Sequence, residues 1–144
     1  MLYINYLANI KNTPERVKKY LITRIPPKHF NFFQNSDIKH MPQLSPSQNL
    51  LYSYKNKNIS FNQFKEKFVN EIENRQDMKQ AIEKLVKDLK HGENICLICY
   101  EEDSNECHRK IIADYIKSKY GIDYIDIKKE ENPYKQLSLW DFEG

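Results

Sequence analysis

Residues 94–127, NICLICYEEDSNECHRKIIADYIKSKYGIDYIDI, predict a strand, a helix and a second strand in close succession. Residues 94–100 are apolar and β-branched, and residues 123–127 repeat that character, so both segments are typical of strands. Between them, residues 107–120 form a helical segment that ends at Gly121, a residue that commonly terminates helices. Strands joined by a helix through short connections pair in parallel, with a right-handed crossover. This stretch therefore predicts an α/β fold.

The remaining strands and the connections complete the predicted architecture. Short apolar runs at residues 2–8 and 20–25 predict two more strands. Residues 26–45 show no clear period and predict a long functional loop. We expect one α/β domain over residues 1–128, a Rossmann-like three-layer sandwich around a small, mostly parallel sheet. Residues 129–144 are charged and contain a proline, so we expect them to form a C-terminal extension.

Helix starts are marked by side chains that cap free backbone N–H groups. Such patterns occur at Thr13-Pro14, at Ser45-Pro46, at Ser60 with Gln63, and at Asp77. After Ser60 and again after Asp77, apolar residues recur at helical spacing. The second of these segments ends at His91-Gly92 and is the clearest amphipathic helix in the chain.

Length and composition exclude several classes of protein. A chain of 144 residues can bury a core without disulfides or a metal. It contains no apolar run long enough to span a membrane and no signal-peptide pattern, so we expect a cytoplasmic protein that does not bind membranes. The three cysteines are odd in number and lie within twelve positions, which indicates reduced thiols rather than a disulfide framework.

The charge is distributed unevenly. Residues 1–68 carry eleven Lys and Arg against three Asp and Glu, whereas residues 69–144 carry twelve against seventeen. Residues 22–41, ITRIPPKHFNFFQNSDIKHM, interleave basic and aromatic side chains, a pattern that suits phosphate contact and base stacking. We therefore predict a nucleotide or a nucleic acid as a partner. The alternative is that these lysines only keep the protein soluble.

Cys96 and Cys99 form a C-x-x-C pattern, which can indicate zinc or redox chemistry. On a strand, residues three apart point to opposite faces, so these two thiols cannot meet at one ion. We expect Cys96 to be a small core residue and predict neither a metal nor another cofactor. A metal site built from Cys99, Cys107 and His108 is a third hypothesis, with an incomplete ligand set.

The carboxyl edge of the sheet is where ligands bind in open α/β folds. Cys99 and Glu101 lie at that edge, and Cys107, His108 and Arg109 form the first turn of the following helix, with its cap among residues 103–105. A helix N-terminus and neighbouring basic groups lower the pKa of a thiol and attract anions.

The predicted roles of these residues follow from their chemistry. We predict that Cys107 is a nucleophile, with Glu101 as an alternative nucleophile or base and His108 as a proton shuttle. Arg109, together with Arg24 at the end of an earlier strand, would bind an anion. A purely structural alternative is a buried cysteine beside a salt-bridged His-Arg pair that stabilises the loop.

The segment CLICYEEDSNECHRKIIADYI resembles the hallmark of the family named domain of unknown function 488. The segments YLANIK, ITRIPPKHF and LSPSQNLLYSYKNKNISFNQFKEKF occur in the same order as in that family. The resemblance implies a Rossmann-like α/β fold and a suspected site, which would comprise Arg24, Cys99, Glu101, Cys107, His108 and Arg109. It implies no reaction, because fold analogy alone names none. A glycine-rich stretch found in some members is missing here.

The tail contains QLSLW at residues 136–140, which resembles the peptide that docks bacterial repair proteins on the sliding clamp. Gln136 would bind the pocket rim, while Leu137, Leu139 and Trp140 would supply the apolar contacts. Trp140 stands where phenylalanine is usual. The alternative is that the tail folds back over the sheet.

Two functions follow from the sequence: an enzyme acting on a nucleotide or a nucleic-acid-linked anion, or a non-catalytic module that associates with nucleic acid or the clamp.

Overall fold

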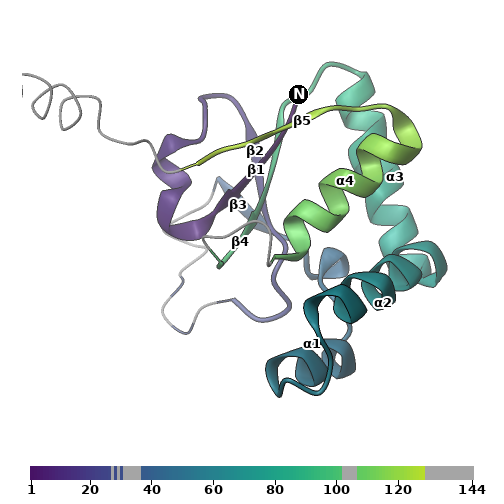
Figure 1. Cartoon of the computed structure of the whole chain (residues 1–144). Helices are drawn as coiled ribbons and strands as arrows, with labels where there is room; N and C mark the ends of the chain where they lie inside the picture. The colour runs from purple at the N-terminus through teal and green to yellow at the C-terminus, as the bar shows by residue number, and fades with distance from the viewer. Residues whose placement is uncertain (27, 29, 31–36, 102–106, 129–144) are drawn as a thin grey trace, which may run out of the picture.

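A computed structural model shows the architecture and describes residues 1–26, 28, 30, 37–101 and 107–128. The elements are β1 (Leu2–Tyr6), η1 (Leu7–Asn12), β2 (Lys18–Leu21), β3 (Ile38–His40), η2 (Pro42–Leu44), α1 (Gln48–Lys55), α2 (Phe61–Asn74), α3 (Gln76–Lys90), β4 (Ile95–Cys99), α4 (His108–Tyr120) and β5 (Tyr124–Asp126). The predicted α/β class is confirmed (Figure 1).

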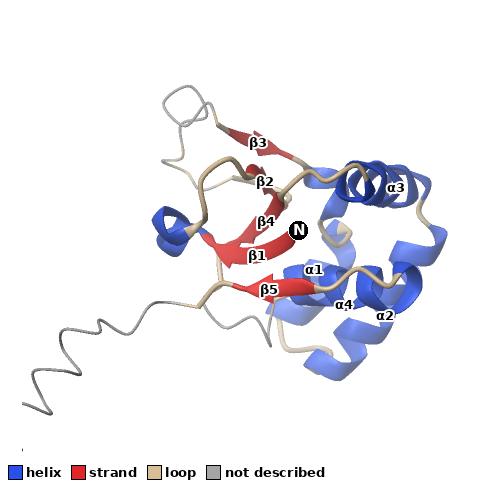
Figure 2. Ribbon diagram, turned by 90° about the horizontal axis from the view of Figure 1, so that it is seen from above, coloured by secondary structure: helices blue, strands red, loops and turns tan. Residues whose placement is uncertain are grey.

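Five parallel strands form one sheet in the order β3-β2-β4-β1-β5. The helices α1 to α4 lie on one side of this sheet, and the short 3₁₀ helix η1 lies on the other (Figure 2). The arrangement is a Rossmann-like three-layer sandwich with one thick and one thin outer layer. Among the described residues, no helix is both long and apolar enough to cross a membrane.

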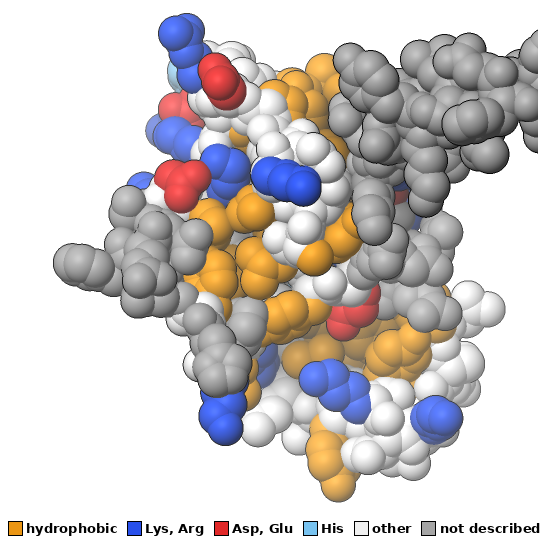
Figure 3. Space-filling model, turned by 90° about the vertical axis from the view of Figure 1, so that its left-hand side faces the viewer, with side chains coloured by type: hydrophobic (Ala, Val, Ile, Leu, Met, Phe, Trp, Pro, Cys, Tyr) orange, Lys and Arg blue, Asp and Glu red, His pale blue; other side chains and the backbone are white. Residues whose placement is uncertain are grey.

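The two faces of the sheet have unequal cores. The helix side holds the large cluster, which includes Phe68, Leu97 and Cys99. The opposite side holds a small cluster that includes Cys96 and Ile98. Figure 3, which views the molecule from the side away from the helices, shows hydrophobic side chains gathered there with charged ones around them. Because Cys96 and Cys99 belong to different clusters, the prediction that they point to opposite faces is confirmed.

The strand register brings three strand ends together at the carboxyl edge. Tyr6 of β1 pairs with Cys99 of β4, and Leu21 of β2 pairs with Ile98 of β4. Helix α4 follows β4 and begins near this edge (Figure 1). The parallel β4-α4-β5 unit predicted from the sequence is therefore present, although β5 pairs with β1 rather than with β4.

Several local predictions were wrong. No helix follows Thr13-Pro14: Thr13 ends η1, and its hydroxyl accepts a hydrogen bond from the Asn5 side chain, so it caps no following helix. The segment 26–45 contains the strand β3, which is only three residues long and carries no periodic signal.

Two helix caps also differ from the expectation, while another is confirmed. Helix α1 is capped by Ser47 rather than Ser45, and the N-cap of α3 is Arg75 rather than Asp77, without a capping hydrogen bond from its side chain. The capping box of Ser60 and Gln63 is present at the start of α2. Near-equivalent polar residues one or two positions apart explain why the exact caps were missed.

Candidate functional site

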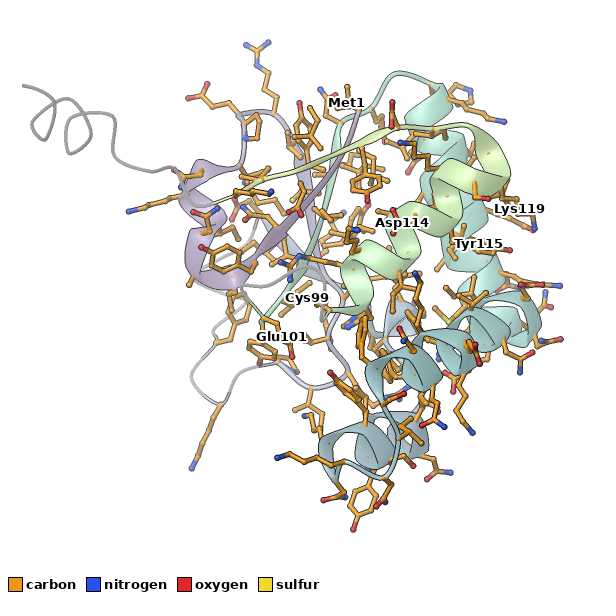
Figure 4. All side chains as sticks on the ribbon, viewed as in Figure 1. Met1, Cys99, Glu101, Asp114, Tyr115 and Lys119 are labelled. Carbon is orange, nitrogen blue, oxygen red and sulfur yellow. The ribbon has the colours of Figure 1, made fainter. Side chains whose placement is uncertain are left out.

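The site is built where β4 ends and α4 begins. Cys99 is the last residue of β4, and Cys107 is the N-cap of α4, with an extended backbone at φ −126°. The expected cap among residues 103–105 was wrong, because Cys107 itself precedes the first helical residue. Figure 4 shows Cys99 and Glu101 at the end of β4, beside the first turn of α4.

The imidazole of His108 lies between two thiols. Its Nδ1 is 3.7 Å from the Cys99 Sγ and 3.9 Å from the Cys107 Sγ, and its Nε2 is 3.6 Å from the Cys99 Sγ. Its Nε2 lies 2.8 Å from the carbonyl oxygen of Ile22. A carbonyl oxygen only accepts hydrogen bonds, so Nε2 must carry a proton. Nδ1 is therefore the nitrogen that is free to take a proton from a thiol.

The thiols and the imidazole are removed from water. Cys99 is fully buried, and Cys107 and His108 are 2% and 8% exposed. Phe68 of α2 packs against His108 edge to face, with ring centroids 5.8 Å apart and an interplanar angle of 89°. Phe68 belongs to the segment after Ser60 in which apolar residues recur at helical spacing, but that spacing does not reveal a contact with the imidazole.

Electrostatics make Cys107 the acidic thiol of the pair. Burial raises the pKa of a thiol, but the hydrogen bonds from Cys99 and His108 and the charges of His108 and Arg109 outweigh it, so the Cys107 pKa lies well below its usual value. Burial and the neighbouring Cys107 raise the Cys99 pKa well above its usual value.

His108 shifts in the complementary direction. Burial lowers the pKa of an imidazole, but contact with Cys107 and with the Ile22 carbonyl oxygen raises the His108 pKa above 6.5. Both shifts favour a Cys107 thiolate beside a His108 imidazolium, whose second proton lies on Nδ1.

Arg109 is fully buried in the first turn of α4. Its Nη1 donates a hydrogen bond to the carbonyl oxygen of Glu101, and its guanidinium carbon lies 5.9 Å from the centroid of the Tyr6 ring. It therefore ties the end of β4 to the first turn of α4, and its charge favours the Cys107 thiolate.

The prediction that Arg24 ends a strand was wrong, because β2 ends at Leu21. Arg24 lies two residues beyond Ile22, whose carbonyl oxygen binds His108. Its Nε donates to the carbonyl oxygen of Pro46 at 3.0 Å, and the side chain is half-buried. Anion binding by Arg24 and Arg109 stays a prediction.

The donor atoms of Cys99, Cys107 and His108 all lie within 4.8 Å of one another, close enough to contact one metal ion. A structural zinc site takes four ligands, so this set is one short by itself. The metal hypothesis from the sequence therefore stays open, and elemental analysis of the purified protein would decide it.

The residues predicted to dock on the clamp lie outside the described residues. They are Gln136, Leu137, Leu139 and Trp140.

Glu101 places a carboxyl group over the acidic thiol. Its Oε2 lies 3.3 Å from the Cys107 Sγ, and the residue as a whole is exposed. Burial of the carboxyl and the charge on Cys107 raise the Glu101 pKa above its ordinary value of 4.5. The Glu101 carboxyl can therefore hold a proton beside Cys107 while remaining reachable from solvent.

The raised Glu101 pKa predicts a stability change for Glu101→Gln. The folded chain holds this proton more tightly than the unfolded chain, so the contribution to stability is present below pH 4.5 and is lost as pH rises through the folded pKa. At neutral pH the ionised carboxylate therefore opposes folding. We expect urea unfolding to show Glu101→Gln as more stable than the wild type at pH 7, with the gap closing below pH 4.5. An equal gap at both pH values would contradict the raised Glu101 pKa.

Comparison with known proteins gives one match. The family model DUF488-N3a, described as the active DUF488-N3 subclade, matches residues 3–120. This range includes every residue of the site from Arg24 to Arg109 and excludes the tail. No curated protein and no solved structure matches the chain.

Proposed function

The chain belongs to the DUF488 family, in the DUF488-N3a subclade, and from this premise we propose that it is an enzyme with a cysteine nucleophile. Its substrate would be a nucleotide or another nucleic-acid-linked anion. The family is one of unknown function, so the reaction has to be argued from the site.

The observation that carries the proposal is the orientation of the Cys107–His108 pair. The Ile22 carbonyl oxygen fixes the proton on Nε2, which leaves Nδ1 facing the Cys107 sulfur at 3.9 Å. A nucleophilic thiol needs an adjacent base that is itself held by a third group. The backbone carbonyl of Ile22 takes that third place here.

Glu101 supplies the second acid–base group. In the proposed reaction the Cys107 sulfur forms a bond to an electrophilic atom of the substrate, and the bond from that atom to the leaving group breaks. The fraction of Glu101 that the raised pKa keeps protonated gives its proton to the leaving group. Water then loses a proton to Glu101 and attacks the same atom, so that the bond to sulfur breaks and the Cys107 thiolate is restored.

Basic groups around the site support an anionic substrate. The buried Arg109 charge and the N-terminus of α4 both make this edge electropositive. Arg24 lies close in sequence to Ile22 and within the basic first half of the chain. These features suit a phosphate-bearing ligand, and the neighbouring exposed ring of Tyr100 suits a base that stacks.

A thiol-alkylation series tests the proposal. Iodoacetamide should modify Cys107 with a pH midpoint well below that of a free thiol, because the reaction follows the thiolate fraction. Peptide mass mapping separates Cys107 from Cys96 and Cys99, whose pKa values burial raises. A nucleoside monophosphate, and to a smaller extent inorganic phosphate, should slow the modification. A Cys107 midpoint equal to that of a free thiol would refute the nucleophile, and unchanged rates with both ligands would refute the anion site.

A further inference from the structure

Two buried thiols lie side by side at the end of β4 and the start of α4. The Sγ atoms of Cys99 and Cys107 are within 4.8 Å of each other, and both lie about equally far from the His108 Nδ1. The proposed nucleophilic role uses only Cys107. Cys99 is a buried thiol that forms no bond and transfers no proton in that mechanism.

We propose that Cys107 is a site of oxidation by small hydroperoxides and that Cys99 resolves the oxidised form into a reversible Cys99–Cys107 disulfide. The inference rests on the proposed function in one respect, since both use Cys107 as the attacking sulfur. It adds a partner residue, a class of reactant and a means of regulation that nucleophilic catalysis does not require.

The positions of the two residues favour this pairing. Cys99 is held by the β4 ladder opposite Tyr6, and Cys107 is held at the α4 N-cap, so both backbones are fixed. Both side chains belong to the core cluster on the helix side of the sheet. A disulfide needs a sulfur–sulfur distance of about 2 Å, so the sulfurs must approach each other further. Side-chain rotation can supply part of that movement. Cys96 points to the opposite face and cannot take part.

The chemistry balances with a hydroperoxide as the only co-reactant. The Cys107 thiolate attacks the terminal peroxide oxygen, so a sulfur–oxygen bond forms and the oxygen–oxygen bond breaks. The His108 imidazolium gives its Nδ1 proton to the departing alkoxide, or to hydroxide in the case of hydrogen peroxide. Cys107 is thereby oxidised to a sulfenic acid, and the peroxide is reduced to an alcohol or water.

Resolution uses the same imidazole a second time. The neutral Nδ1 is 3.7 Å from the Cys99 Sγ and can take its proton, which burial otherwise retains. The Cys99 sulfur then attacks the Cys107 sulfur, so the disulfide forms and the sulfur–oxygen bond breaks. The hydroxide that leaves takes the proton back from His108 and departs as water.

The disulfide would act as a switch on the proposed enzyme. It removes the Cys107 nucleophile while oxidation lasts, and it protects that sulfur from further, irreversible oxidation. A dithiol reductant would restore both thiols.

The test compares the full-length wild type with Cys96→Ser, Cys99→Ser and Cys107→Ser after treatment with hydrogen peroxide. Peptide mapping without reductant should recover a Cys99–Cys107 disulfide, lighter by two hydrogen atoms, from the wild type and from Cys96→Ser. Cys99→Ser should instead retain a sulfenic acid at Cys107 that a dimedone probe traps. In Cys107→Ser, residue 99 should stay reduced. Circular dichroism checks that each variant is folded, and if Cys107→Ser is not, the wild type and Cys96→Ser still decide the pairing.

The outcomes separate this inference from the proposed function. A disulfide that includes Cys96, or a sulfinic acid at Cys107 with no disulfide, overturns the role of Cys99. No oxidation of a Cys107 that iodoacetamide still modifies rapidly overturns the switch and leaves the nucleophile standing. No oxidation together with slow alkylation overturns both. After peroxide, iodoacetamide should no longer modify Cys107, and dithiothreitol should restore the modification.

Discussion

Replacing His108 by glutamine is expected to slow the alkylation of Cys107 at pH 7 by roughly thirtyfold or more. The change removes the Nδ1 that stabilises the thiolate, so ionisation should fall to the few per cent of an ordinary cysteine at this pH. Burial then raises the thiol pKa further, because Cys107 is only 2% exposed. The measurement is the iodoacetamide rate constant at Cys107 as a function of pH.

Glutamine is chosen because its amide nitrogen can still donate to the Ile22 carbonyl oxygen, as the Nε2 of His108 does. The matched variant His108→Ala removes both contacts. Equal alkylation profiles for the two variants would assign the effect to Nδ1, whereas a much slower His108→Ala would point to the Ile22 contact as the main support. A profile of His108→Gln that coincides with that of the wild type would mean that His108 does not ionise Cys107.

The overall fold could be predicted because its signals are local. Residues 94–120 show an apolar strand run followed by a helical segment, and these patterns predict β4 and α4 directly. Gly121 ends α4 in a left-handed conformation with φ 69°. The strand β3 could not be predicted, because it is only three residues long and shows no alternating pattern. It forms because it pairs with β2 at the edge of the sheet. The pairing of β5 with β1 likewise depends on contacts between distant parts of the chain, which no local sequence pattern predicts.

The chemistry of the site could be predicted only as far as sequence neighbours allow. Cys107 and His108 are adjacent, and their place at a helix start was visible from the residues alone. The Ile22 carbonyl oxygen and the Phe68 ring are far away in sequence, and backbone atoms and core aromatics carry no chemical signature of a site. These two contacts nevertheless set the tautomer and the orientation of the imidazole, so the structure supplies what the motif leaves out.

Replacing Phe68 by alanine is expected to cost roughly 3 to 5 kcal/mol of unfolding free energy, the usual range for a buried aromatic residue. Phe68 is fully buried, stacks on Phe64 at 5.9 Å between centroids, and meets His108 edge to face. A loss of this size is a large part of the 5 to 15 kcal/mol or so that holds a typical domain together. Urea unfolding measures it, and Phe61→Ala on the same helix is the control, because Phe61 is only partly buried.

The conservative variant Phe68→Leu separates packing from the positioning of the imidazole. Leucine keeps most of the apolar contact, so the chain should stay folded, but the aromatic edge against His108 is lost. We expect the Cys107 alkylation midpoint to move to higher pH in Phe68→Leu and to stay unchanged in Phe61→Leu. If both leucine variants keep the wild-type midpoint while Phe68→Ala still unfolds easily, then Phe68 stabilises the core alone. In that case the Ile22 carbonyl oxygen by itself would orient His108.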